Sequence, residues 1–98
     1  MSQRRVVITG IGVISSLGKD LPVFWANLLA GKSGISRIER FDTTAFDSKI
    51  GSEVKDFEPT LYFKEPKTAR RNDRFCQMAV AAAKLALQDS GLDLDQTD

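Results

Sequence analysis

Four basic side chains in the stretch PKTARRNDRF are the clearest candidates for a binding role. They stand at positions i, i+3, i+4 and i+7 of a helical pattern: Lys67, Arg70, Arg71 and Arg74. A helix would gather them on one face, where like charges repel each other by about 0.2–0.5 kcal/mol per pair unless an acidic partner relieves the repulsion. The spacing leaves two interpretations open: a docking surface for an acidic partner, or a solvated face partly neutralised by Glu65 and Asp73.

A glycine-rich turn follows the first apolar run, in the stretch VVITGIGVISSLG at residues 6–18. A dinucleotide-binding fingerprint needs GxGxxG between a strand and a helix; Gly10 and Gly12 fit this pattern, whereas its third position is Ser15. The next predicted helix also starts several residues later than a phosphate-binding turn requires. We therefore interpret the two glycines as permitting a tight backbone path beside another strand or subunit, with nucleotide binding as an alternative.

The remaining chemistry-bearing residues predict no catalytic pair. The chain has one cysteine, Cys76, and no histidine that could act as its base. Cys76 would lie in the first turn of a helix, where the helix dipole can lower a thiol pKa, but its neighbour Phe75 favours the role of a small hydrophobe. Four carboxylates show no metal-ligand spacing: Asp42, Asp47, Asp56 and Glu58. We expect no catalytic residue, no cofactor and no metal site in this sequence.

The composition is that of an ordinary globular protein. Of its 98 residues, 42% are hydrophobic and 28% are charged, with a formal net charge of +1. This length predicts one domain with a modest core, and the balanced charge disfavours a nucleic-acid partner. No run approaches the roughly 18–20 apolar residues of a membrane span, and a single cysteine suits a reducing compartment. We therefore expect a cytoplasmic protein without a membrane partner.

Two elements are predicted in the first third of the chain. Residues 4–9, RRVVIT, have the unbroken β-branched pattern of a strand that is buried on both faces. A helix follows at about residues 21–30, with Asp20 as its cap and Gly31 as its stop. One face of this helix is apolar and must pack on something: Leu21, Trp25, Leu28 and Leu29, with Phe24 beside them. No second strong strand is visible, so a partner chain or further sequence must supply one.

The rest of the chain predicts turns and two more helices. A short strand is possible near Lys49–Val54, Pro66 can open a second helix, and a third can run from its cap Asp73 to Ser90. The third helix carries an apolar stripe that we expect to face inward: Phe75, Met78, Ala79, Ala82, Leu85 and Ala86. Five alanines within residues 79–86 allow this helix to lie very close to a neighbouring backbone.

Four stretches in this order resemble the opening part of a β-ketoacyl-acyl carrier protein synthase, in the type II form that elongates fatty acids. They are RRVVITGIGVISSLG, FWANLLAGKSGISRIERFDTTAFDSKIGSEVKDF, ARRNDRF and AVAAAKLALQDSGL, and the resemblance covers essentially all 98 residues. It implies an α/β class and a thiolase-like fold of layered helices and mixed five-stranded sheets. Residues 1–98 would be the N-terminal segment of the ketosynthase N-terminal domain, supplying the first strand plus covering helices. The family works as homodimers.

The resemblance implies a reaction that this sequence does not carry by itself. The family joins an acyl chain to malonyl on acyl carrier protein by decarboxylative Claisen condensation, using a cysteine that forms a thioester, two histidines and a lysine. Cys76 does not match that cysteine, and no histidine is present. We therefore expect these residues to be inactive alone.

The resemblance does carry over a docking role. The family binds the acidic carrier protein through positive residues at the positions of Lys67, Arg70 and Arg71, and Arg74 joins them on helical spacing only. Two alternatives from other classes stay open: a non-catalytic partner subunit similar to a chain-length factor, and a nucleotide-binding protein.

Overall fold

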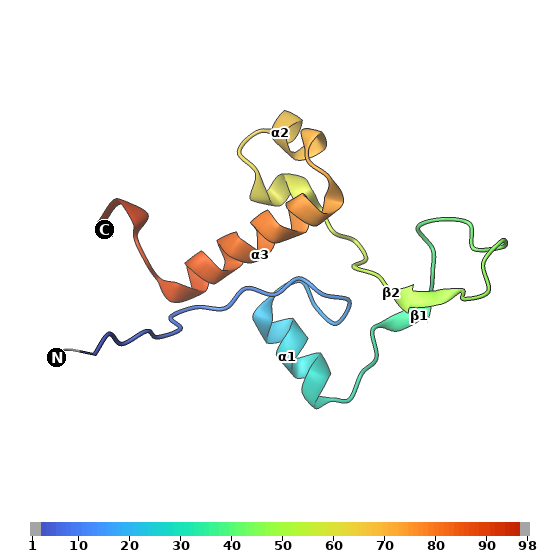
Figure 1. Ribbon diagram of the computed structural model, residues 1–98, viewed down its shortest axis with the longest axis horizontal. Helices are drawn as coiled ribbons and strands as arrows, with labels where there is room; N and C mark the ends of the chain where they lie inside the picture. Colours follow the sequence, from blue (N-terminus) through green and yellow to red (C-terminus); the bar gives the residue numbers. More distant parts are fainter. Residues whose placement is uncertain (1–2, 97–98) are drawn as a thin grey trace.

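The N-terminal segment is extended but does not belong to a sheet. The computed structural model describes residues 3–96, and in it residues 3–14 have no regular secondary structure. Residues 3–9 of this segment lead away from the helices (Figure 1), and their side chains are exposed, Val6 at 93% and Ile8 at 84%. Residues 4–9 are therefore unpaired here, in agreement with the expectation that their neighbouring strands come from elsewhere. Within residues 3–96 no second strand lies beside them to accept and donate the ladder hydrogen bonds.

Helix α1, Leu21–Leu29, confirms the first predicted helix together with its signals. The Asp20 carboxylate accepts a hydrogen bond from the Val23 amide at 2.9 Å, and Gly31 ends the helix in the left-handed region at φ +72°. The apolar face has no covering layer in the described part of the chain: Trp25 is 54% and Leu29 70% exposed. The helix thus forms where its local signals predict, while its packing partner is not among these residues.

A small hairpin follows α1. Strands β1, Ile35–Arg37, and β2, Ile50–Ser52, pair antiparallel, with Ser36 opposite Gly51. The structure confirms the short strand predicted near residues 49–54. Its partner β1 was not predicted, because three residues between turn formers carry too little periodicity to be recognised.

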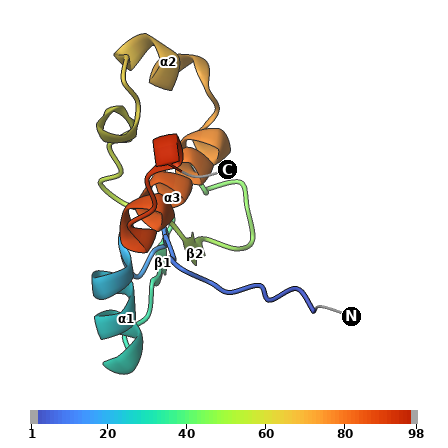
Figure 2. The same cartoon turned by 90° about the vertical axis from the view of Figure 1, so that its left-hand side faces the viewer.

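The last part of the chain builds a helical unit. A 3₁₀ turn at Pro59–Tyr62 leads to α2, Pro66–Arg71, and α3, Arg74–Ser90, and a second 3₁₀ turn lies at Leu94–Gln96. Both predicted helices are confirmed. In both views α3 runs between α2 on one side and α1 on the other (Figures 1 and 2).

Two details of α3 correct the prediction. Asp73 stands at the N-cap, but its side chain makes no capping hydrogen bond. Two residues of the predicted apolar stripe do not face inward, since Phe75 is 73% exposed and Ala79 is exposed as well, whereas Ala81, outside the stripe, is completely buried. The 3₁₀ turn packs against α3 from a direction that the apolar stripe did not indicate, and α2 in turn packs against the 3₁₀ turn.

The glycines of the opening turn pass directly along α3. A methyl group added to Gly12 would overlap the Ala82 carbonyl oxygen and stand 2.6 Å from the Ala86 nitrogen, and one added to Gly10 would stand 2.6 Å from the Ser90 nitrogen. The tight path that the sequence predicted is therefore confirmed. The neighbour is the alanine-rich helix of the same chain, rather than another strand or subunit.

The described residues enclose little core. The accessible surface is 8065 Å², against about 5,500 Å² for a compact protein of this mass. The radius of gyration is 17.2 Å, where a folded domain of this length has about 13 Å. Three apolar residues count as buried: Phe57, Ala69 and Ala81. Within residues 3–96, no helix is both long and apolar enough to cross a membrane.

Candidate functional site

Lys67, Arg70 and Arg71 form an exposed basic face on α2. All three side chains are exposed, and none takes part in an ion pair within residues 3–96. At 3.6 residues per turn they cluster on one side of the helix, and Ala69 lies about 150° away on the other side. Ala69 is 1% exposed, so α2 buries its small residue and presents its cations to solvent.

Arg74 does not belong to the basic face. The backbone leaves the helical region at Asn72, φ −102° and ψ 143°, so the continuous helix that the spacing of the four cations requires is broken. Arg74 begins α3 instead, and its Nη2 donates a hydrogen bond to the Val54 carbonyl at 2.7 Å. Its guanidinium also lies 5.6 Å from the centroid of the Phe57 ring. The predicted grouping of Arg74 with the other three is therefore wrong in its geometry.

The surroundings of Arg74 explain its electrostatics. Burial lowers the pKa of its guanidinium below the ordinary value, the nearby positive charge of Arg40 adds to this effect, and Glu53 opposes it. The Phe57 ring beneath it is buried and stacks on Tyr62, with the ring centroids 5.9 Å apart. Arg74 thus holds the start of α3 against the segment that follows β2.

The side of α2 opposite the basic face is tied to α3 by one side chain. Gln77 donates from its amide nitrogen to the Ala69 carbonyl at 2.7 Å, and Ala69 lies directly before Arg70 and Arg71 in the sequence. Gln77 was not predicted as a site residue. The available signal was one polar residue in a largely apolar helix, which is too common a feature to identify a site.

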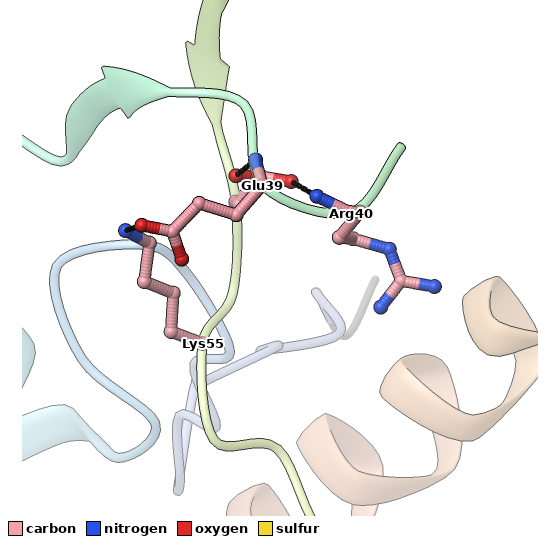
Figure 3. A network of polar contacts seen from close by, with 4 residues as sticks. Glu39, Arg40 and Lys55 are labelled. Carbon is pink, nitrogen blue, oxygen red and sulfur yellow. Dashed lines mark hydrogen bonds and ion pairs between the residues drawn. The ribbon is translucent and has the colours of Figure 1, made fainter. Parts of the chain in front are cut away.

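A hollow of about 460 Å³ lies between the end of the hairpin and the start of α3. The Glu53 carboxylate closes one side by accepting hydrogen bonds from the backbone amides of Glu39 at 2.9 Å and Arg40 at 3.1 Å (Figure 3). The first of these bonds is the main reason why the pKa of Glu53 is lowered. Lys55 pairs with Glu39 at 3.3 Å. The hollow is lined by three acids and three bases, so it favours no ligand of one charge: Glu39, Glu53, Asp56, Arg40, Lys55 and Arg74.

A second hollow, of about 270 Å³, lies at the small residues after the glycine turn. Ser15, Ser16 and Gly18 line it together with residues of the hairpin, and the hydroxyls of Ser16 and Ser52 are hydrogen-bonded. Cys76 is separate from both hollows, half-buried in the first turn of α3. In residues 3–96 no group of three or more His, Cys, Asp and Glu side chains is placed to hold a metal ion.

Several known proteins are similar to this chain. The family model described as Beta-ketoacyl synthase, N-terminal domain, matches residues 3–98. The chain is 47% identical over 98 residues to 3-oxoacyl-[acyl-carrier-protein] synthase 2 of Coxiella burnetii (strain RSA 493 / Nine Mile phase I), covering 100% of this chain and 23% of that protein. It is 48% identical over 90 residues to 3-oxoacyl-[acyl-carrier-protein] synthase II, chloroplastic, of Arabidopsis thaliana, covering 92% of this chain and 16% of that protein.

The fold has a counterpart among solved structures. The ishigamide ketosynthase/chain length factor matches with a TM-score of 0.85 at 45% sequence identity, covering 96% of this chain and 23% of that chain. The predicted α/β class, as part of a thiolase-like fold, is confirmed, and so is the resemblance to synthases of the second type. The chain spans 23% of the length of the Coxiella relative. By its family match and these relatives, the chain belongs to the β-ketoacyl synthase family, in the part that corresponds to the N-terminal domain.

Proposed function

We propose that this chain is part of a type II β-ketoacyl-acyl carrier protein synthase that elongates fatty acids. The parent protein would join an acyl group to malonyl carried on acyl carrier protein by decarboxylative Claisen condensation. The names of the relatives, 3-oxoacyl-[acyl-carrier-protein] synthase 2, support this assignment. Residues 1–98 would form the N-terminal segment of the N-terminal domain. They would supply scaffold and a docking surface, while the thioester-forming cysteine, two histidines and lysine come from elsewhere in the parent protein.

The observation that carries the docking role is the basic face. Lys67, Arg70 and Arg71 are exposed, lie on one side of a short helix and have no ion pair within residues 3–96. Their mutual repulsion is a cost that an acidic carrier protein would remove on binding, and clustered cations also speed the encounter with such a partner. We leave Arg74 out of the direct contact, because its guanidinium is engaged by Val54 and Phe57.

The proposal also covers the compartment, the oligomeric state and the partners of the parent protein. We propose that it works in the cytoplasm as a homodimer, without nucleic-acid or membrane partners and without a cofactor. A single cysteine is compatible with a reducing compartment. The uncovered apolar side chains of the N-terminal segment and α1 support packing against further protein, either from the same polypeptide or from a second subunit.

The test replaces the three cations of the basic face by alanine in the full-length protein. The variant Lys67→Ala/Arg70→Ala/Arg71→Ala is expected to bind acyl carrier protein roughly ten- to a hundredfold more weakly at low salt, with a smaller loss at high salt, because exposed charges are screened. Affinity is measured by calorimetry at two ionic strengths. The matched control removes one lysine and two arginines that are exposed outside α2: Lys32, Arg37 and Arg40. Unchanged affinity of the α2 variant at both ionic strengths would reject the docking role.

A second candidate function is that of a non-catalytic partner subunit. One observation favours it: the solved structure with a TM-score of 0.85 is named as a ketosynthase/chain length factor. The two functions differ in whether the parent protein forms an acyl thioester. Incubating the full-length protein with radiolabelled acyl carrier protein substrate and measuring protein-bound thioester separates them: label on a cysteine supports the synthase, and absence of label supports the partner subunit.

A further inference from the structure

The basic face stands on a helix that cannot hold its own orientation. Helix α2 has six residues, Pro66–Arg71, and isolated helices of this length are not stable in water. The direction in which its cations point is therefore decided by tertiary contacts. The 3₁₀ turn contacts α2, and one hydrogen bond reaches α2 from α3: the Gln77 side chain donates to the Ala69 carbonyl at 2.7 Å.

We propose that Gln77 is a positioning residue for carrier-protein docking, which sets the rotation of α2 so that Lys67, Arg70 and Arg71 face outward. This inference rests on the proposed function of the basic face. Ala69 is 1% exposed, so its carbonyl faces protein rather than solvent. A carbonyl in the last turn points along the helix axis, so this bond holds the C-terminal end of α2 on α3 while the buried side of Ala69 lies about 150° around the helix from the cations. The cations are therefore held on the opposite side.

The last turn of α2 depends on Gln77 for a second reason. The terminal carbonyls of a helix have no partner inside the helix and need one from outside. Asn72 meets this need for Thr68 by donating from its side chain at 2.6 Å, and its backbone amide donates to Ala69 at 3.2 Å. Gln77 adds the contact that ties this turn to α3. Without it, the buried Ala69 carbonyl keeps the longer bond from the Asn72 amide, and the hydrogen bond between α2 and α3 is lost.

Helix α3, which carries Gln77, is held in place by two other side-chain contacts. Arg74, three residues before Gln77 on α3, is bound to the Val54 carbonyl and packed over the buried Phe57 ring. Farther along the same helix, Lys84 donates to the Tyr62 carbonyl. These two contacts hold α3 on the segment between β2 and α2, so the position of the Gln77 amide does not shift freely.

The proposal predicts how the affinity for carrier protein should depend on salt concentration in a Gln77 variant. Gln77 is half-buried and uncharged, so its replacement should not alter the number of charges that meet the carrier protein. The affinity should fall while its salt dependence stays that of the wild type. Removing the cations themselves should reduce the salt dependence as well.

The experiment compares Gln77→Met with Gln88→Met in the full-length protein. Gln88 is the matched control, since it is an exposed glutamine on the same helix. Gln77→Met is expected to raise KM for the carrier-protein substrate roughly three- to tenfold with kcat unchanged. Turnover of an acyl thioester of a small thiol should stay the same as in the wild type. Gln88→Met should behave as the wild type. Combined with the triple basic-face variant, Gln77→Met should add no further loss.

Three results would overturn the inference. The first is an unchanged KM of Gln77→Met for the carrier-protein substrate. The second is an equal loss of activity with the small-thiol substrate, which would indicate general damage to the protein. The third is an effect of Gln77→Met on KM that adds fully to that of the basic-face variant. The proposed function is judged separately, by the basic-face variant alone. If that variant binds carrier protein normally, the docking role itself fails; if it binds weakly and Gln77→Met does not, only the role of Gln77 fails.

Discussion

At the scale of single residues, Arg74 lies close in sequence to the three cations of the basic face but makes different contacts. The residues share a charge and a nearly continuous stretch of sequence, but a non-helical backbone at Asn72 separates them. Arg70 and Arg71 remain in solvent, and Arg74 turns to a carbonyl and an aromatic ring. A planar guanidinium can satisfy both contacts at once, which an ammonium group does less well.

We therefore expect Arg74 to contribute to stability more than to charge-driven binding. Arg74→Met should lower the free energy of unfolding by about 1–2 kcal/mol, because it removes a hydrogen bond and a cation–π contact. Arg74→Lys should recover part of this loss. The measurement is chemical denaturation of the full-length protein, with Arg37→Met, an exposed arginine of β1, as the control. A loss as small as that of the control would contradict the role.

At the scale of elements, the glycine turn and α3 are in very close contact. Gly12 faces the carbonyl of Ala82 and the nitrogen of Ala86, and the Ile11 amide donates to the Asp89 carboxylate at 3.0 Å. Two features that looked separate in the sequence, a GxG turn and an alanine-rich helix, thus meet each other. This contact explains the glycines without a nucleotide, because the space in front of Gly12 is occupied by helix backbone.

Replacing Gly12 by alanine should force these two segments apart. A methyl group has no room beside the Ala82 carbonyl, so Gly12→Ala is expected to cost about 1–3 kcal/mol of stability through overpacking. Gly51→Ala is the control, since a methyl group there would meet only the Ile38 side chain, at 3.3 Å. Thermal unfolding of the full-length variants measures both. Equal melting temperatures for the two variants would show that the turn and α3 are not in such close contact.

At the scale of the whole molecule, the described residues have the surface of an incomplete core. The accessible surface of 8065 Å² exceeds the roughly 5,500 Å² of a compact protein of this mass, and large apolar side chains such as Val6 and Ile8 are open to solvent. The chain spans 23% of the length of the Coxiella relative. The apolar surface is therefore best understood as an interface with further protein.

The 98 residues expressed alone should accordingly not show a cooperative transition. We expect a broad thermal profile by circular dichroism and strong binding of a hydrophobic dye, because too little apolar surface is buried to offset the conformational entropy of the chain. The full-length protein, measured in parallel, should melt sharply and bind little dye. A sharp transition of the 98-residue chain would mean that it is stable without a covering layer.

Local signals in the sequence determined the helices. A capping carboxylate at Asp20, a proline in the first turn of α2, and glycines after α1 and α3 act within a few residues, so they predict where a helix begins and ends without knowledge of its neighbours. The ordered motifs likewise led to the family, since family membership is carried by residue identities.

Tertiary structure alone decided which side of each element is buried and which residues share a surface. The exposure of Phe75, the separation of Arg74 from the basic face and the bond from Gln77 to Ala69 all depend on how α2, α3 and the segment after β2 meet. The strand predicted at residues 4–9 shows the same limit, because a strand exists only where another backbone pairs with it. Spacing along one element can place charges on a common face, but contacts between elements determine whether that face exists.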